Sequence, residues 1–312
     1  MNARTQSART DRPGMVAPDI AGLEPLRTIR SRWPMAMGGL LTVAMIAGLL
    51  RELLASGLSG LGRIVPGSPL FYLFFVLLYL SPITGDTIIF RRLWGIPFAG
   101  FVALIKKRIA NEVVFGYSGE AYFYAWARSR ATMVAAPFGA VKDVSILSAI
   151  AGNGMTLAMV AVAVPLGHAL LPPDMLRPIG GSVAVTAAIS LPFLLFSRRV
   201  FSQPWRTLWW IFGVHWVRLL VGQVLIALAW HFALPGVSMG LWLLLAAGRM
   251  LVSRLPLVPN KDVLFANLAI VAIGRDTALS DLMAFSAALT VLLHLVLIGL
   301  FSVQAVVARN AG

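Results

Sequence analysis

The sequence has no cysteine among its 312 residues, and it is poor in charge. Disulfide bonds, thiolate nucleophiles and cysteine-ligated metal sites are therefore excluded. Charged residues make up 12% of the chain and hydrophobic residues 59%, whereas about a quarter of a soluble domain is charged. Histidine occurs only at positions 168, 215, 231 and 294, without the spacing of metal ligands. We therefore expect no metal and no cofactor.

Acidic residues are the scarcest charged group, with 12 Asp and Glu against 26 Lys and Arg and a net charge of +14. In a soluble protein such an excess suggests nucleic-acid binding. Here no basic stripe lies outside the loops that flank apolar runs, so we expect no nucleic acid. Several of these runs approach or exceed the roughly 20 residues that cross a bilayer core. The composition therefore predicts an all-α polytopic membrane protein.

The chain divides into a basic, largely disordered cytoplasmic tail over residues 1–33 and a single transmembrane domain over 34–308. Six spanning helices are expected, over 35–54, 70–90, 145–171, 179–197, 208–234 and 282–307. Two other segments, 96–130 and 237–275, each have room for two half-length helices around a polar break, "GYSGE" or "PNKD". Because non-helical backbone survives at membrane depth only inside protein or facing water, we interpret both as broken or re-entrant hairpins.

Basic residues set the expected orientation, because loops on the cytoplasmic side carry surplus Lys and Arg. With the N-terminus inside, nine flanking basic residues also lie inside: Arg91, Arg92, Arg128, Arg130, Lys142, Arg198, Arg199, Arg206 and Arg309. Only Arg51, Arg63, Arg177 and Arg275 lie outside. This asymmetry predicts a bacterial inner-membrane protein with both termini cytoplasmic, in which the two hairpins enter from opposite faces.

The two halves of the domain also share a pattern. Arg108 precedes Gly119-Glu120, and Arg249 precedes Lys261-Asp262 at a similar distance. With hairpins that enter from opposite faces, pseudo-repeats at about 96–171 and 237–307 would form an inverted repeat, a recurring plan of secondary transporters. Coincidence among apolar segments is the alternative.

At the hairpins the sequence resembles the transmembrane region of lysylphosphatidylglycerol synthases, over roughly residues 36–308. The first motif, "FGYSGEAYFYAWARSR", keeps two glycines and a glutamate of the family's Pro-Gly-Arg-x-Gly-Glu pattern, with Phe115 and Tyr117 in place of Pro and Arg. The second, "LPLVPNKDVLFAN", keeps Pro256 and Pro259 but lacks the family's glycines and its Arg-Glu. The resemblance implies a stand-alone lipid translocase or an accessory protein of envelope lipid synthesis, without the soluble synthase domain. The second motif's departures leave the ligand open.

Arg218 is the clearest candidate for a functional charge in a span. A charge at the bilayer centre costs about 2.5–3.5 kcal/mol on insertion scales and usually marks function. Arg218 shares a helix face with His215 and Gly222. It is expected either to bind a lipid phosphate through paired donors or to form an ion pair with one of three acids, namely Glu120, Asp86 or Asp262.

The other hairpin charges leave similar alternatives. Arg108 and Glu112 lie one turn apart and either serve a ligand or pair with each other. Lys106 and Lys107 are expected to extend to the cytoplasmic interface. Glu120 follows the first break, where it can accept a proton or hold an arginine. Asp86 and Asn153 lie beside glycines and mark either polar bends or close helix packing.

Together these residues predict a mainly cationic pocket for the phosphate of a membrane phospholipid or lipid-linked intermediate, whose acyl chains stay in the bilayer. Its expected members are Arg218, Arg249, Arg254, Lys261, Asp262, Arg108, Glu120, His215, Asp86 and Asn153. A lipid transporter is the leading function. An intramembrane enzyme would need a positioned acid–base pair, for which only Glu120 or Asp262 is available. A non-transporting partner of a lipid-synthesis enzyme is the third possibility.

Overall fold

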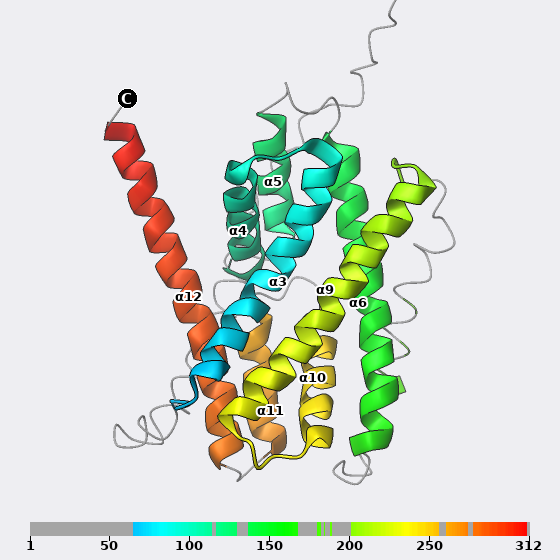
Figure 1. The fold of residues 1–312 in the computed structure, drawn as a ribbon, viewed down its shortest axis with the longest axis vertical. Helices are drawn as coiled ribbons and strands as arrows, with labels where there is room; N and C mark the ends of the chain where they lie inside the picture. The colour runs from blue at the N-terminus through cyan, green and yellow to red at the C-terminus, as the bar shows by residue number, and fades with distance from the viewer. Residues whose placement is uncertain are drawn as a thin grey trace, which may run out of the picture.

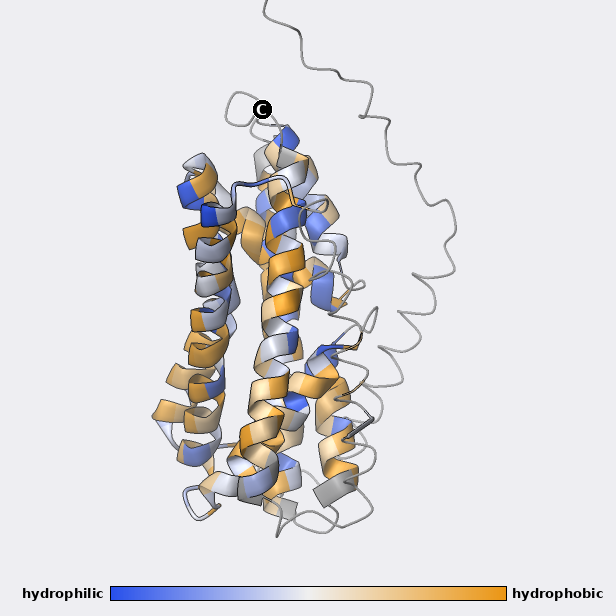
Figure 2. Ribbon diagram, turned by 90° about the vertical axis from the view of Figure 1, so that its right-hand side faces the viewer, coloured by the Kyte–Doolittle hydropathy of each residue, from blue (hydrophilic) through white to orange (hydrophobic). Residues whose placement is uncertain are grey.

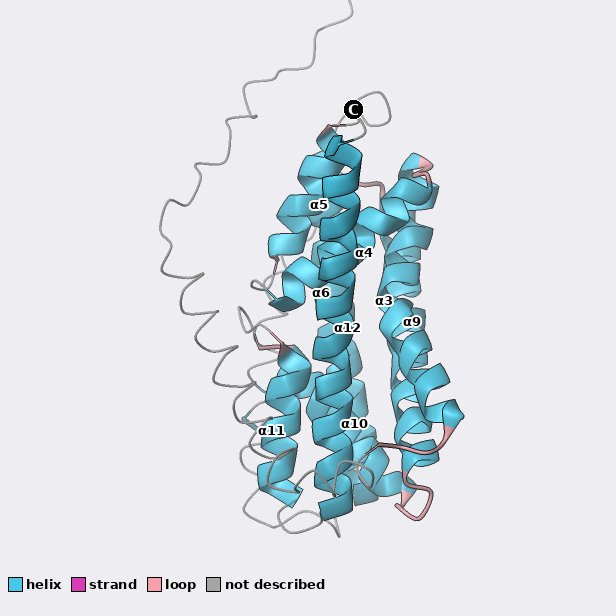
Figure 3. Ribbon diagram, turned by 90° about the vertical axis from the view of Figure 1, so that its left-hand side faces the viewer, coloured by secondary structure: helices cyan, strands magenta, loops and turns pink. Residues whose placement is uncertain are grey.

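The computed structural model describes residues 65–113, 117–129, 137–167, 201–255, 260–273 and 277–310, with residues 180, 181, 184 and 188. Helices are the regular elements of these ranges (Figures 1 and 3). They are α3 (Pro69–Trp94), α4 (Phe98–Val113), α5 (Ser118–Arg128), α6 (Pro137–Gly167), α9 (Trp205–Ala233), α10 (Met239–Ser253), α11 (Lys261–Ile273) and α12 (Thr277–Asn310). The tail 1–33 and the expected span 35–54 lie outside the described residues, as does nearly all of 179–197.

Four helices are long and apolar enough to cross a bilayer: Pro69–Trp94, Phe138–Ala163, Trp205–Ala233 and Ala278–Gln304. Even the 26 residues of α3 reach about 39 Å, beyond the roughly 30 Å of a hydrocarbon core. The structure is thus all-helical in the described ranges, and four of its helices coincide with expected spans and have the length and composition that a span requires. The third helix begins at Pro137 rather than at residue 145. Asp143 does not end the helix, because its carboxylate accepts backbone N–H bonds from Ser202 and Gln203, both at 2.8 Å.

The half-length helices predicted from the two unusual segments are present. α4 and α5 have 16 and 11 residues, and α10 and α11 have 15 and 13, so none reaches the roughly 20 residues of a span. Tyr117, just before α5, has φ 73°, and Asn260, just before α11, has φ 46°. Both angles lie in the left-handed region that non-glycine residues seldom adopt, so the backbone reverses sharply at each break.

The order of long, short, short and long helices occurs twice along the described chain, as α3–α6 and as α9–α12. Figures 1 and 3 place α4 and α5 in the upper half of the molecule and α10 and α11 in the lower half. The long helix α3 packs along α9, while α10 packs against α6 and α11 against α12. The short hairpins therefore fill the space between long helices from opposite ends.

Close backbone approach holds the first hairpin together. A Cβ atom at Gly119 would lie 2.0 Å from the carbonyl oxygen of Lys107, so only glycine lets α5 approach α4 this closely. The Ser118 hydroxyl donates to the Ala110 carbonyl and the Gly119 N–H donates to the Asn111 side-chain oxygen, both at 2.7 Å. These bonds satisfy backbone and side-chain groups where the two helices pack together.

Hydrophobic side chains dominate the helices, with polar positions scattered along their middle (Figure 2). Basic residues at described helix ends gather at the upper end of Figure 1, namely Arg91, Arg92, Arg128, Lys142 and Arg206. The loop 234–238 at the opposite end carries no charged residue. In the described part of the chain, these helix-end basic residues therefore lie at the end that the predicted orientation places in the cytoplasm.

Candidate functional site

The tips of the two hairpins meet near the middle of the molecule. The backbone N–H of Asn260, just before α11, donates to the carbonyl oxygen of Glu112, near the end of α4, at 2.7 Å. This bond joins residues from the two halves of the chain. It brings the charged residues at the end of one hairpin beside those of the other.

Four charged side chains from four helices form what we call the Asp86 network. The Lys107 ammonium lies 2.8 Å from the Asp86 carboxylate and 3.4 Å from that of Glu120. The Arg218 guanidinium lies 3.7 Å from the other oxygen of Asp86. All four side chains are at most 20% exposed. Two cations therefore balance two carboxylates, and the network is neutral as a whole.

The surroundings of Arg218 show how α9 and α3 accommodate it. Its guanidinium donates to the Ser148 hydroxyl of α6 at 2.6 Å. A Cβ atom at Gly85 would lie 2.6 Å from its Cδ, so Gly85 leaves the space in which the side chain crosses α3. Of the three acids proposed from the sequence, Asp86 is the one that Arg218 contacts as an ion pair, and Ser148 is a partner that was not predicted from the sequence.

Lys107 is the network member that sequence reasoning missed. It was expected at the cytoplasmic interface, and that expectation is wrong, because only 7% of the residue is exposed. Consecutive helical residues point about 100° apart, so the three bases of "KKR" diverge. The Lys106 ammonium lies 4.8 Å from the Phe301 ring centroid, while Lys107 faces Asp86. The sequence shows that these three side chains point in different directions around α4. Which of them points into the protein depends on tertiary packing.

Arg108 contacts α3 rather than its neighbour one turn away. Its guanidinium donates to the backbone carbonyl of Tyr79 and lies 4.2 Å from the centroid of the Tyr79 ring. Among the residues described, no ion pair within 4.0 Å joins it to Glu112, so the expected pairing of those two is wrong. Glu112 lies among several charges at the hairpin junction, where Asp262 repels its carboxylate and Arg108, Lys261 and Arg249 attract it.

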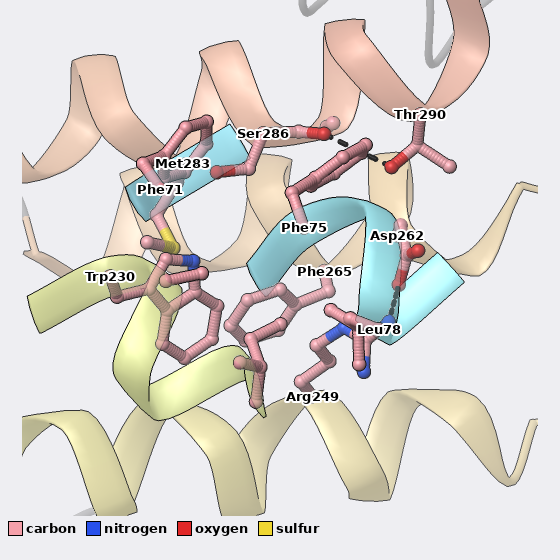
Figure 4. A pocket seen from close by; sticks show the side chains of 13 residues that line it. Phe71, Phe75, Leu78, Trp230, Arg249, Asp262, Phe265, Met283, Ser286 and Thr290 are labelled. Carbon is pink, nitrogen blue, oxygen red and sulfur yellow. Dashed lines mark hydrogen bonds and ion pairs between the residues drawn. The ribbon is translucent and has the colours of Figure 1, made fainter. Parts of the chain in front are cut away.

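The second hairpin has its own ion pair, between Arg249 of α10 and Asp262 of α11, at 2.8 Å. This pair closes one side of a small cavity whose other walls are largely aromatic (Figure 4). The cavity has a volume of about 30 Å³, and Phe71, Phe75, Trp230, Phe265 and Met283 are among its lining residues. It has room for about two or three water molecules, at about 10–15 Å³ each.

Arg254 and Lys261 resemble Arg108 and differ from Lys107, Arg218 and Arg249, which form ion pairs. No carboxylate of the described chain lies within 4.0 Å of either. Lys261 donates to the Ser253 carbonyl at 2.9 Å, and Arg254 donates twice to the Ser253 hydroxyl, at 3.0 and 2.8 Å. A Cβ atom at Gly152 would lie 1.8 Å from Nη1 of Arg254, so this glycine of α6 receives the guanidinium.

The remaining predicted residues have packing roles. His215 is fully buried, with Nε2 3.2 Å from the Val144 carbonyl of α6. Asn153 lies between two glycines of α6. One of them receives Arg254, and a Cβ atom at the other, Gly154, would lie 3.0 Å from the Trp216 ring. The glycines beside Asn153 therefore serve close helix packing. This was one of the two interpretations made from the sequence, the other being a polar bend.

The site consequently divides the predicted pocket into ion-paired charges and three cations, Arg108, Arg254 and Lys261, that have no carboxylate of the described residues within 4.0 Å. Within the described ranges, no group of three or more His, Asp or Glu side chains is placed to hold a metal ion. No protein-family model, curated protein or solved structure matches the chain. Any functional assignment therefore rests on the chemistry of the hairpin junction.

Proposed function

We propose that the protein is a transporter that moves a phosphate-bearing lipid across the bacterial inner membrane. The observation that carries this proposal is the position of Arg254 and Lys261. Both lie where two half-length hairpins meet, and neither has a carboxylate of the described residues within 4.0 Å.

Phosphate is the ligand that these two cations suit. The planar guanidinium of Arg254 can donate two parallel bonds to phosphate oxygens, and the Lys261 ammonium adds a point charge. A charge at membrane depth costs about 2.5–3.5 kcal/mol on insertion scales, so cations there without an ion pair usually mark a substrate path. Lys107, Arg218 and Arg249 have already been neutralised by carboxylates and are better suited to holding the helices around the path.

The arrangement of the hairpins favours transport over static binding. Hairpins that enter from opposite ends and meet at their tips are expected of an inverted repeat, in which each half opens toward one face. The outer surfaces of α3 and α9 are apolar and exposed, for example at Leu73, Val76, Val217 and Leu220. Acyl chains can therefore stay in the bilayer while the headgroup crosses the protein. The resemblance to the transmembrane region of lysylphosphatidylglycerol synthases implies the same class of activity.

The proposal includes six spans, both termini in the cytoplasm and the basic end of the bundle facing inward. Reconstitution tests the function. The full-length protein is placed in vesicles of phosphatidylethanolamine and phosphatidylglycerol that contain a trace of headgroup-labelled phosphatidylglycerol. Label that crosses faster than in protein-free vesicles, with unchanged lipid chemistry, is the expected result. A chemically altered lipid would indicate an intramembrane enzyme instead, and neither change would indicate an accessory protein.

A further inference from the structure

A second polar cluster lies apart from the ion pairs, where α12, α3 and α4 meet. His294 is 1% exposed and Tyr79 is 4% exposed, and their ring centroids are 5.5 Å apart. The Arg108 guanidinium covers the same Tyr79 ring from the side of α4. Four buried atoms have no hydrogen-bond partner among the described residues: both ring nitrogens of His294, the Tyr79 hydroxyl and Nε of Arg108.

Buried polar atoms without partners require an explanation. Leaving one unsatisfied is costly, and here four belong to residues of three neighbouring helices. Ordered water satisfies such groups in folded proteins, commonly with about three hydrogen bonds per molecule. A histidine in the middle of a spanning helix is also rare, and His, Asp and Glu in such positions serve proton relays in pumps and transporters. His294 is the one member of this cluster whose unperturbed charge changes near neutral pH.

The charges around His294 come from each neighbouring helix. Burial is the main influence that opposes a positive charge on the imidazole, Arg108 of α4 also opposes one, and Asp262 of α11 favours one. Tyr79 of α3 contributes a neutral hydroxyl. Asp262 already forms an ion pair with Arg249 at 2.8 Å, so its attraction for a charged imidazole is weakened. The imidazole therefore gains a proton more readily when an anion balances the charge of Arg108.

Such an anion is the lipid phosphate of the proposed function. Glu112 faces both Arg108 and Lys261, so one electrostatic network links the junction to the His294 cluster. We propose that His294 is a proton-binding site that couples proton movement to lipid transport, one proton accompanying one singly charged phosphate. This inference rests on the proposed transport function. Because phosphate and proton each favour the other's binding, they cross together and no net charge moves.

The test uses the full-length protein in phosphatidylethanolamine–phosphatidylglycerol vesicles with a trace of labelled phosphatidylglycerol. The outside is made about one pH unit more acidic than the inside, and the label's distribution between leaflets is measured at steady state. One coupled proton predicts about tenfold enrichment in the inner leaflet, because one pH unit corresponds to a tenfold ratio. A membrane potential without a pH difference should leave the distribution even.

Two variants of His294 and one control separate proton binding from packing. His294→Phe keeps a ring against Tyr79 and His294→Gln keeps polarity, and both should abolish the enrichment. His231→Phe, in the last turn of α9, should retain it. Enrichment that survives in either His294 variant would overturn the proposal, as would wild-type transport with no response to the gradient. Wild-type protein that moves no lipid at all would overturn the proposed function, and this inference with it.

Discussion

Gly119 occupies the closest approach between the two helices of the first hairpin. A methyl group there would meet the Lys107 carbonyl oxygen at 2.0 Å, and backbone cannot move aside as a flexible side chain can. We expect Gly119→Ala to destabilise the protein by about 1–3 kcal/mol, the usual range for overpacking. Gly213→Ala is the matched control, because no atom lies within 4 Å of its added carbon. Thermal unfolding in detergent compares the two, and equal melting temperatures would contradict the packing described.

Asp86 is the acid on which two cations depend. Asp86→Asn would leave Lys107 and Arg218 without their closest carboxylate, and removing one partner of a buried ion pair costs about 3–5 kcal/mol. We expect a large fall in the melting temperature, whereas Arg206→Gln at the exposed start of α9 should have almost none. Asp86→Asn protein that melts with the wild type would show that the network does not stabilise the fold.

The charges at these positions could be read from the sequence, but their partners could not. The sequence showed that Asp86, Glu120 and Arg218 lie at membrane depth, and it named Asp86 among the partners of Arg218. It did not show that Lys107 faces inward, because the rotation of a helix depends on neighbours far away in the chain. His294 was missed for a related reason. A lone histidine in an apolar run has no motif, and only its contacts with α3 and α4 distinguish it.

At the scale of the elements, the breaks were predictable and the meeting of the hairpins was not. Segments 96–130 and 237–275 are each too long for one half-length helix and too interrupted by polar residues or prolines for one span. This pattern directly predicted the helix pairs α4–α5 and α10–α11. The contact between Asn260 and Glu112 joins residues far apart in the sequence, so no local pattern could indicate it.

The contact between the tips can be tested by cross-linking, because the chain has no cysteine of its own. A direct backbone hydrogen bond brings the two Cα atoms within the roughly 4.4–6.8 Å that a disulfide requires. We expect the double variant Glu112→Cys with Asn260→Cys to cross-link on mild oxidation, seen as a shift on a non-reducing gel after cleavage between the halves. Glu112→Cys with Ser238→Cys, at the far end of α10, should not. Equal cross-linking of both pairs would contradict the arrangement.

For the molecule as a whole, the distribution of basic residues predicts its orientation in the membrane. Ser129 lies at the basic end and Gly236 at the uncharged end, so single cysteines at these positions report opposite faces. Gly236→Cys should react with an impermeant thiol reagent applied to intact spheroplasts, and Ser129→Cys should react only after permeabilisation. The reverse pattern would place the basic end outside and would contradict the predicted orientation.

The central claim is that a lipid phosphate binds the cations left without a carboxylate at the hairpin junction. Its most direct test is the rate at which labelled phosphatidylglycerol crosses vesicles containing Arg254→Gln protein. Hydrogen bonds to charged groups contribute about 1.5–3 kcal/mol, so the rate should fall at least about tenfold with unchanged melting. Arg206→Gln should stay within about twofold of the wild type on the same scale. Arg254→Gln protein that melts normally and transports at the wild-type rate would contradict the account.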